Sequence, residues 1–505
     1  MAMNIKQAKQ QIEDTLRAYL TKDELGNYLI PTIRQRPVLL MGPPGIGKTQ
    51  IMEQIAADTG VGLVAYTITH HTRQSAIGLP FISHKNYGGR EYAVTEYTMS
   101  EIIASVYDQI EASGISEGIL FLDEINCVSE TLAPTMLQFL QYKTFGPHRV
   151  PDGFLIVTAG NPPQYNRSVR DFDIVTLDRM KRIKIEEDYP AWKEYAYRIG
   201  IHGAVMAYLE IRRDHFYSIR TEIDDKYFVT ARGWEDLSRI LYVYEELGTT
   251  VTEDLIRQYL QDPVIAQAFS AYYDLYNKYR NVYRVPEILG GTAGADTTGI
   301  RTAPFDEKLS LLGLLIDALN QEFQTYAHDL AVQKILFSQL TELRGRLQGT
   351  DADAVSELTA LQDQMRDRLT RQKTAKMISR EEEKISRSAL GIMADLIREL
   401  TLSRTGDSRQ DFGLLKTRFQ EMEAARQEKI TETGDHLTNT FSYLSSVFGE
   451  GQEMVIFLSE LAAGYYSLKF VSECGNDAYY RYNKLLLLRD RREQLQADVM
   501  DLLNL

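Results

Sequence analysis

The segment GPPGIGKT, residues 42–49, constrains this chain more than any other, because it follows an apolar run and precedes an amphipathic one. A glycine-rich loop between a strand and a helix lets backbone N–H groups converge on phosphates, and the helix presents its positive end to them. In this pattern Lys48 reaches the β- and γ-phosphates, and the Thr49 hydroxyl is a ligand for Mg²⁺. The sequence therefore predicts a nucleotide site. The residues expected to line it are Gly42, Pro43, Pro44, Gly45, Ile46, Gly47, Lys48, Thr49 and Gln50.

Two acidic residues end a later apolar run, ILFLDE. Behind a phosphate loop, Asp123 is expected to hold Mg²⁺ together with Thr49, the carboxylate acting through water. Glu124 is expected to orient or deprotonate the attacking water. The pair predicts hydrolysis of ATP with Mg²⁺, although a phosphate loop recognises phosphates and leaves the choice between ATP and GTP open.

Short apolar runs alternate with longer amphipathic ones between Pro37 and Glu187, which predicts an α/β core with helices on both faces of a parallel sheet. The expected strands are 37–42, 62–69, 118–124, 153–160 and 181–187. The expected helices are 48–59, 98–113 and 128–141.

A chain of 505 residues is too long for one compact domain. We expect a nucleotide-binding domain over 1–190, a helical lid over 191–285, and a linker over 286–304 that is rich in Gly, Thr and Ala. Apolar residues at helical spacing then predict long helices over 305–505, paired in a bundle or coiled coil.

Charge and hydropathy limit the classes of partner. A formal net charge of −14 and a pI near 5.2 argue against a protein that coats nucleic acid. The N-terminus does not have the pattern of a signal peptide, and the run LSLLGLLIDAL is too short to span a bilayer. We expect a cytoplasmic protein without membrane insertion.

The motifs GPPGIGKT, FLDEIN and TAGNPP, in this order, resemble those of AAA+ ATPases, and specifically of the MoxR branch. The resemblance covers about residues 1–285, a little over half of the chain, and does not extend to 305–505. It implies a P-loop AAA+ core with a small helical lid. It also implies that Asn161 is the first sensor, which positions the lytic water, whereas a plain Asn-Pro turn is the alternative.

Two further segments resemble the same family. IVTLDRMKRIKIEEDYP is similar to its D-R-F-x-x-R-x-x-x-x-Y-P segment, with Met180 where Phe is usual. The resemblance makes Arg179 the first candidate for an arginine finger that acts on a neighbouring subunit, and Arg182 the second, unless they are surface arginines without a role. FVTARGWED resembles the second-sensor helix, with Ala231 in place of proline, so Arg232 is expected to contact nucleotide from the lid or to lie on a helix surface.

Residues 70–97 contain a predicted hairpin with its turn near Gly88 and Gly89. In the MoxR branch this region carries an insertion that faces the central channel of a ring. The resemblance thus implies that Phe81 and Tyr87 contact a substrate, and an ordinary surface hairpin is the alternative.

The resemblance implies a hexameric ring that remodels a protein partner, including partners with a von Willebrand factor A domain, and 305–505 is the expected adaptor or assembly element. A nucleic-acid motor or restriction-type NTPase is a rival that the acidic charge disfavours. A nucleotide-gated scaffold with little turnover is a second rival, against which Glu124 and Asn161 argue.

Overall fold

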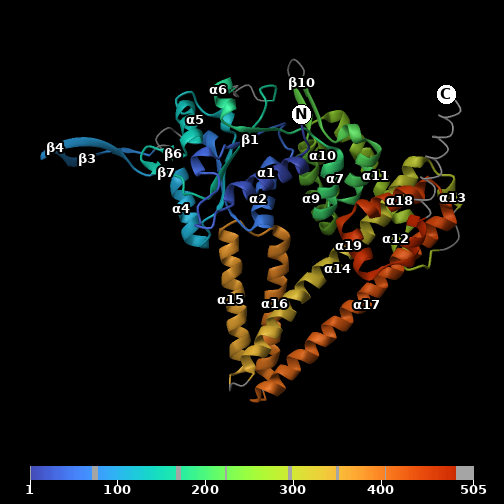
Figure 1. Ribbon diagram of the computed structural model, residues 1–505. Coiled ribbons are helices and arrows are strands. Elements are labelled where there is room, and N and C mark those ends of the chain that lie inside the picture. The colour runs from blue at the N-terminus through green and yellow to red at the C-terminus, as the bar shows by residue number, and fades with distance from the viewer. Residues whose placement is uncertain are drawn as a thin grey trace, which may run out of the picture. The chain divides into compact units, whose positions relative to one another are not determined.

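The computed structural model describes residues 2–70, 78–165, 172–221, 225–293, 298–348, 352–403 and 405–484. Its chain divides into two compact units (Figure 1). The first contains Met1–Asp188 and Thr359–Gly391, and the second contains Tyr189–Leu358 and Ile392–Leu505. The described residues of the second unit are mostly helical, so the predicted α/β core followed by a helical region is confirmed.

The first unit is built on a sheet of 5 parallel strands in the order β2-β5-β8-β1-β9. In this order β1 lies beside β8, and β8 lies beside β5. The residues that follow these three strands therefore meet at one edge of the sheet, where parallel α/β folds bind ligands. The strands are β1 (Val38–Met41), β2 (Gly62–Thr67), β5 (Gly118–Asp123), β8 (Phe154–Gly160) and β9 (Lys181–Lys184).

Helices cover both faces of this sheet because successive strand residues point to opposite sides. Leu39, Leu120 and Ile156 pack with α4 and α5, whereas their strand neighbours pack with α1 and α2 on the other face. These helices are α1 (Ile5–Leu20), α2 (Lys48–Thr59), α4 (Glu101–Ser113) and α5 (Ala133–Tyr142). The three helices expected between the strands are confirmed, with shifts of a few residues at their ends.

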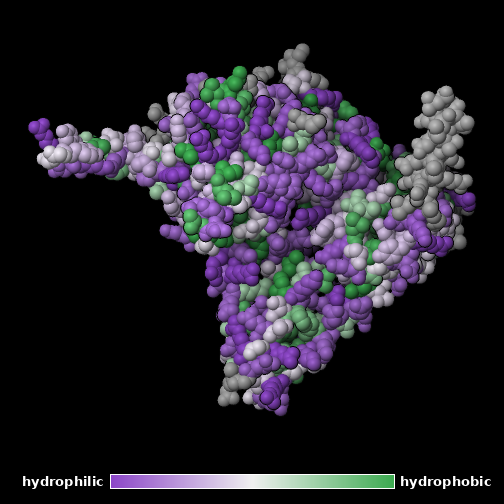
Figure 2. Space-filling view, viewed as in Figure 1, coloured by the Kyte–Doolittle hydropathy of each residue, from purple (hydrophilic) through white to green (hydrophobic). Residues whose placement is uncertain are grey.

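An antiparallel hairpin extends from this unit (Figures 1 and 2). Strands β3 (Pro80–Tyr87) and β4 (Arg90–Tyr97) pair along their whole length, and Gly88 and Gly89 form the turn at φ of 61° and 81°. Two positive φ values suit the tight turns that match strand twist, and glycine adopts them without steric cost. The predicted turn position is confirmed, whereas residues 71–77 lie outside the described part of the chain.

The turn of a helical hairpin distant in sequence belongs to the same unit. The hairpin is formed by α15 (Ala354–Thr374) and α16 (Arg380–Ser403). In the turn between them, the buried Ala375 carbonyl accepts hydrogen bonds from Leu63 N at 3.4 Å and Gln109 Nε2 at 2.9 Å. The turn thereby uses a backbone donor of β2 and a side-chain donor of α4.

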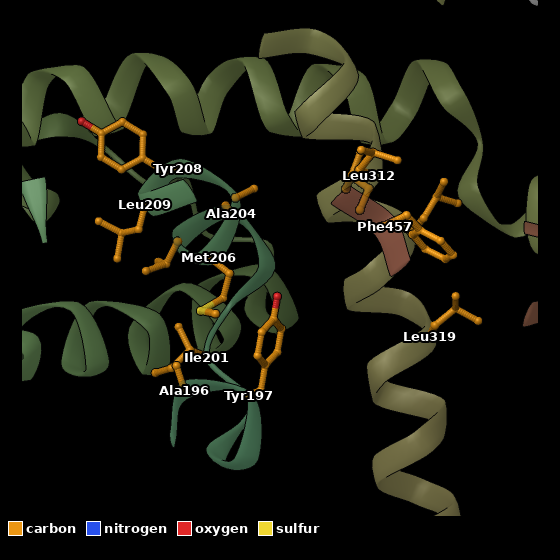
Figure 3. Close-up of a cluster of buried hydrophobic side chains, with 14 of the residues drawn as sticks. Ala196, Tyr197, Ile201, Ala204, Met206, Tyr208, Leu209, Leu312, Leu319 and Phe457 are labelled. Carbon is orange, nitrogen blue, oxygen red and sulfur yellow. The ribbon is translucent and has the colours of Figure 1, made fainter. Parts of the chain in front are cut away.

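The second unit has one large apolar core, part of which Figure 3 shows with side chains of α7, α8, α14 and α18. Its main elements are α7 (Tyr189–Ile199), α8 (Gly203–Ile211), β10 (Ser218–Thr221), β11 (Lys226–Val229), α9 (Ala231–Leu247), α10 (Glu253–Tyr259), α11 (Pro263–Tyr283), α12 (Val285–Leu289), α13 (Thr298–Arg301), α14 (Phe305–Leu347), α17 (Ser408–Phe448), α18 (Gln452–Ala463) and α19 (Tyr465–Cys474).

Two elements of this unit were not expected from the sequence. The segment expected to be a helical lid includes the β10–β11 hairpin, and the expected linker begins with helix α12. Helix α12 forms because Val285, Ile288 and Leu289 share one face and bury it in the core. Residues 294–297 of the expected linker and 485–505 of the expected helical domain lie outside the described residues, and the proposed domain limits stay a prediction.

The described helices were also compared with the length and apolarity of a membrane span. None of them is long and apolar enough by itself to cross a membrane. Helices α18 and α19 reach that length and apolarity only when taken together, and the chain bends by 87° between them. Both helices contribute buried side chains to the core of the second unit, including Phe457 and Phe470.

Replacing Asp317 on α14 by asparagine is expected to stabilise the second unit at alkaline pH. Burial raises the pKa of the Asp317 carboxyl to about 6, although His202 and Arg280 act to lower it. The unfolded chain releases this proton near pH 4, so the free energy of unfolding falls as pH rises from about 4 to 6. We expect Asp317→Asn to gain about 1–2 kcal/mol near pH 8 and close to nothing near pH 3.

Urea unfolding can measure this effect because both tryptophans of the chain, Trp192 and Trp234, lie in the second unit. Their fluorescence reports the unfolding midpoint of that unit. Asp274→Asn, on the exposed side of α11, is the matched control. An equal gain at both pH values would contradict the assignment to Asp317.

Candidate nucleotide site

The loop between β1 and α2 has the backbone form of a phosphate cradle. Gly45 and Gly47 have φ of 73° and 92°, which other residues rarely adopt. Gly42 has no room for a side chain, because a Cβ there would lie 2.8 Å from the Ile185 carbonyl oxygen. The loop leads directly into the N-terminus of α2, where no side-chain hydrogen bond caps the helix in the described residues, and helix N-termini are common binding sites for anions.

Lys48 begins α2 and is only 8% exposed. Its Nζ donates to the Gly42 carbonyl at 2.9 Å, to the Pro43 carbonyl at 2.7 Å and to Asn161 Oδ1 at 2.8 Å. An ammonium group has three protons to donate, and these three acceptors hold it above the loop. The loop lysine and the predicted sensor residue therefore meet, although they are far apart in sequence.

Asp123 ends β5 beside the loop, as its sequence pattern predicts. Its Oδ2 accepts a hydrogen bond from Thr49 Oγ1 at 2.9 Å, and its Oδ1 accepts from the Glu124 N–H at 2.9 Å. A hydroxyl and a carboxylate in contact are hard oxygen donors of the kind that Mg²⁺ prefers. Burial raises the pKa of the nearby Cys127 thiol, and the charges of Glu124 and Asp123 raise it further, which indicates an electronegative turn. These residues fit Mg²⁺.

Glu124 adopts the left-handed backbone conformation, with φ of 56° and ψ of 36°. A side chain in this region of the Ramachandran plot costs about 1 kcal/mol. The chain turns sharply here from β5 into the short helix η3 (Ile125–Cys127). The turn places the partly buried Glu124 side chain directly after Asp123, at the edge of the sheet that carries the loop.

The three candidate arginines lie on exposed positions, two in the first unit and one in the second. Arg179 follows the short helix α6 (Ile174–Asp178), is exposed, and donates to Gln141 Oε1 at 2.9 Å. Arg182 is exposed on β9, opposite Leu39 of β1. Arg232 is exposed on α9 in the second unit. Met180, next to Arg179, is buried among apolar side chains.

Sequence reasoning missed one polar residue at the site. Asn126 lies in η3, is 3% exposed, and donates from Nδ2 to the Asn161 carbonyl at 2.8 Å. The motif FLDEIN contains this residue, but its spacing does not show that the turn after β5 contacts the turn after β8. The strand order makes these turns neighbours.

Comparison with known proteins agrees with this geometry. Residues 37–180 match the family model described as AAA domain (dynein-related subfamily). The match covers the loop, the acidic pair and the Asn161 turn, and it supports a nucleotide-binding ATPase of the AAA+ class. No curated protein matches the chain.

Proposed function

We propose that this chain is a MoxR-type AAA+ ATPase that hydrolyses ATP with Mg²⁺, forms a ring, most simply a hexamer, and remodels a protein partner. The observation that carries the proposal is one hydrogen-bonded cluster of the loop, the acidic strand end and the sensor turn. Lys48 bonds to Asn161, and Thr49 bonds to Asp123. A site that only bound phosphates would not need Asp123 or Asn161.

Each residue then has a separate task in hydrolysis. Loop N–H groups and Lys48 would hold the β- and γ-phosphates, and Thr49 and Asp123 would hold Mg²⁺, which would neutralise charge on the phosphates. Glu124 accepts a proton from the attacking water. Asn161, whose Oδ1 faces Lys48, orients that water beside the γ-phosphate.

The finger arginine would act on a second copy of the chain. Lys181 pairs with Val38 at the start of β1, and Lys181 N donates to the Pro37 carbonyl at 2.8 Å. Arg179 precedes this pairing, so it lies at the edge of the sheet opposite the loop, which follows the end of β1. A four-residue strand, about 13 Å long, separates the two edges. Arg179 is thus badly placed for its own site and exposed for a neighbour's.

Apolar side chains beside Arg179 support a surface for this second copy. On α6, Ile174 is 85% exposed and Val175 is 58% exposed. Figure 2 shows apolar residues gathered over this helix. Exposed apolar side chains next to a charged functional residue favour burial against another protein surface.

Mixing two inactive variants tests action between subunits. Arg179→Ala removes the finger but keeps the nucleotide site, and Lys48→Ala removes the site but keeps the finger. Arg179→Ala alone should hydrolyse ATP at least about 100-fold more slowly, because a finger contributes about 10³-fold or more. Lys48→Ala alone should be slowed at least as much, because it lacks a working nucleotide site. Their mixture should recover a substantial part of the activity, measured as phosphate release.

Arg182→Ala, mixed in the same way, serves as the comparison that identifies the finger. Recovery of ATPase activity in the mixture with the Arg182 variant, but not in the mixture with the Arg179 variant, would identify Arg182 as the finger. No recovery with either variant, at protein concentrations where rings form, would contradict hydrolysis shared between subunits.

The hairpin and the second unit supply the proposed contacts to partner and nucleotide. Phe81 and Tyr87 lie on the same face of the β3–β4 hairpin and are exposed, and the Tyr87 and Tyr92 rings are 6.0 Å apart. Exposed aromatic side chains of this kind suit contact with another protein. We propose that a partner, such as a protein with a von Willebrand factor A domain, binds at this hairpin. We also propose that Arg232 of the second unit contacts the nucleotide from the lid.

A further inference from the structure

Asn126 connects the turn that carries Glu124 to the turn that carries Asn161. It lies two positions after Glu124, and its Nδ2 donates to the Asn161 carbonyl at 2.8 Å. Asn161 in turn accepts from Lys48 through its side chain. Asn126 therefore holds the backbone carbonyl of Asn161, and Lys48 holds its side-chain amide.

The orientation of the Asn126 amide follows from its partner. A backbone carbonyl can only accept, so the nitrogen of the amide must face the Asn161 carbonyl. The other amide atom, Oδ1, is buried and has no hydrogen-bond partner in the described residues. A buried polar atom without a hydrogen-bond partner lowers the stability of the folded protein. The Asn126 side chain is therefore better explained by its contact to Asn161 than by a contribution to stability.

Gly160, the last residue of β8, provides the space for this contact. A Cβ at Gly160 would lie 2.5 Å from Asn126 Oδ1 and 2.9 Å from Asn126 Cγ. Any other residue at this position would push the Asn126 amide away from the Asn161 carbonyl. The asparagine of FLDEIN and the glycine of TAGN are thus matched to one another across neighbouring strands.

We infer that Asn126 is a positioning residue for ATP hydrolysis, which fixes the separation between Glu124 and Asn161. These are the two residues that face the attacking water in the proposed mechanism, so the inference rests on the proposed function. The contact of Asn126 is to the Asn161 turn and not to the phosphate loop, so its loss should change the chemical step more than nucleotide binding. A displacement of about 1 Å in such groups can lower a rate about 100-fold.

The test is a double-mutant cycle on ATPase kinetics with Asn126→Ala and Gly160→Ala. Each single variant should lower kcat about 10- to 100-fold and leave KM for ATP within about threefold. The double variant should be no slower than Asn126→Ala within about twofold, because the methyl group introduced at position 160 then has no amide oxygen to displace. Multiplied effects in the double variant, or an unchanged kcat in Asn126→Ala, would overturn the inference.

Gly391→Ala is the matched control, since a Cβ there meets nothing within 4 Å and the residue is exposed on α16 of the same unit. Thermal unfolding identifies variants that fail to fold. If Asn126→Ala unfolds, Gly160→Ala still decides, because it keeps Asn126 and displaces its amide, while the only further close atom of the three nearest is Met41 Sδ at 3.1 Å, on a flexible side chain. Normal kcat in Gly160→Ala would overturn the inference. A wild-type protein without ATPase activity would overturn the proposed function first, and active wild type with unchanged variants would overturn this inference alone.

Discussion

Replacing Glu124 by glutamine is expected to lower kcat for ATP hydrolysis about 100- to 1,000-fold while ATP still binds. Glutamine keeps the shape of the side chain and its left-handed backbone, but it cannot accept the proton of the attacking water. Lys48 and Thr49, which are proposed to hold the nucleotide, are positioned by hydrogen bonds to the Gly42 and Pro43 carbonyls and to Asp123, and the replacement leaves these bonds in place. Phosphate release should therefore fall, and the Kd for ATP should stay within about threefold.

Glu111→Gln is the matched control for this prediction. Glu111 is exposed on α4 in the same unit, so the same chemical change there should leave kcat unaltered. Unchanged hydrolysis in the Glu124 variant would contradict its role as a base and would favour a nucleotide-gated scaffold. A loss of binding equal to the loss of rate would make Glu124 a binding residue.

Lys48→Ala is expected to weaken ATP binding at least about 100-fold, because it removes charge-assisted hydrogen bonds worth about 1.5–3 kcal/mol each. The ammonium group is almost fully buried at the loop, and no other described lysine donates to the Gly42 or Pro43 carbonyl. A fluorescent ATP analogue, titrated at equilibrium, measures the change. Hydrolysis by this variant should be undetectable at millimolar ATP.

Lys6→Ala, on the exposed side of α1, controls for the loss of one positive charge. Lys48→Arg extends the test, because an arginine keeps the charge but does not fit a site shaped for an ammonium group. Normal affinity in Lys48→Ala would show that the loop does not bind phosphates in the way that its sequence predicts.

Much of the first unit could be predicted from sequence because the information is local. Alternating apolar runs indicate five strands, and each lies within a few residues of its predicted position. The spacing of Gly42, Gly45 and Gly47 indicates the loop, since Gly45 and Gly47 adopt positive φ and Gly42 has no room for a Cβ. Helix α12 was missed because it contains Pro286 and is followed by Gly290 and Gly291, and proline and glycine usually mark loops.

Residue type and spacing along the chain were enough to identify the phosphate loop, the acidic pair and Asn161, because each motif is built from neighbouring residues. They were not enough to place Asn126 against Asn161, to explain Gly160, or to bring Ala375 to β2. These contacts join segments that are distant in sequence, and they exist only because β5 lies beside β8 and because the α15–α16 turn reaches the outer strand. Strand order and long-range packing depend on how the whole chain folds, so a local sequence pattern does not predict them.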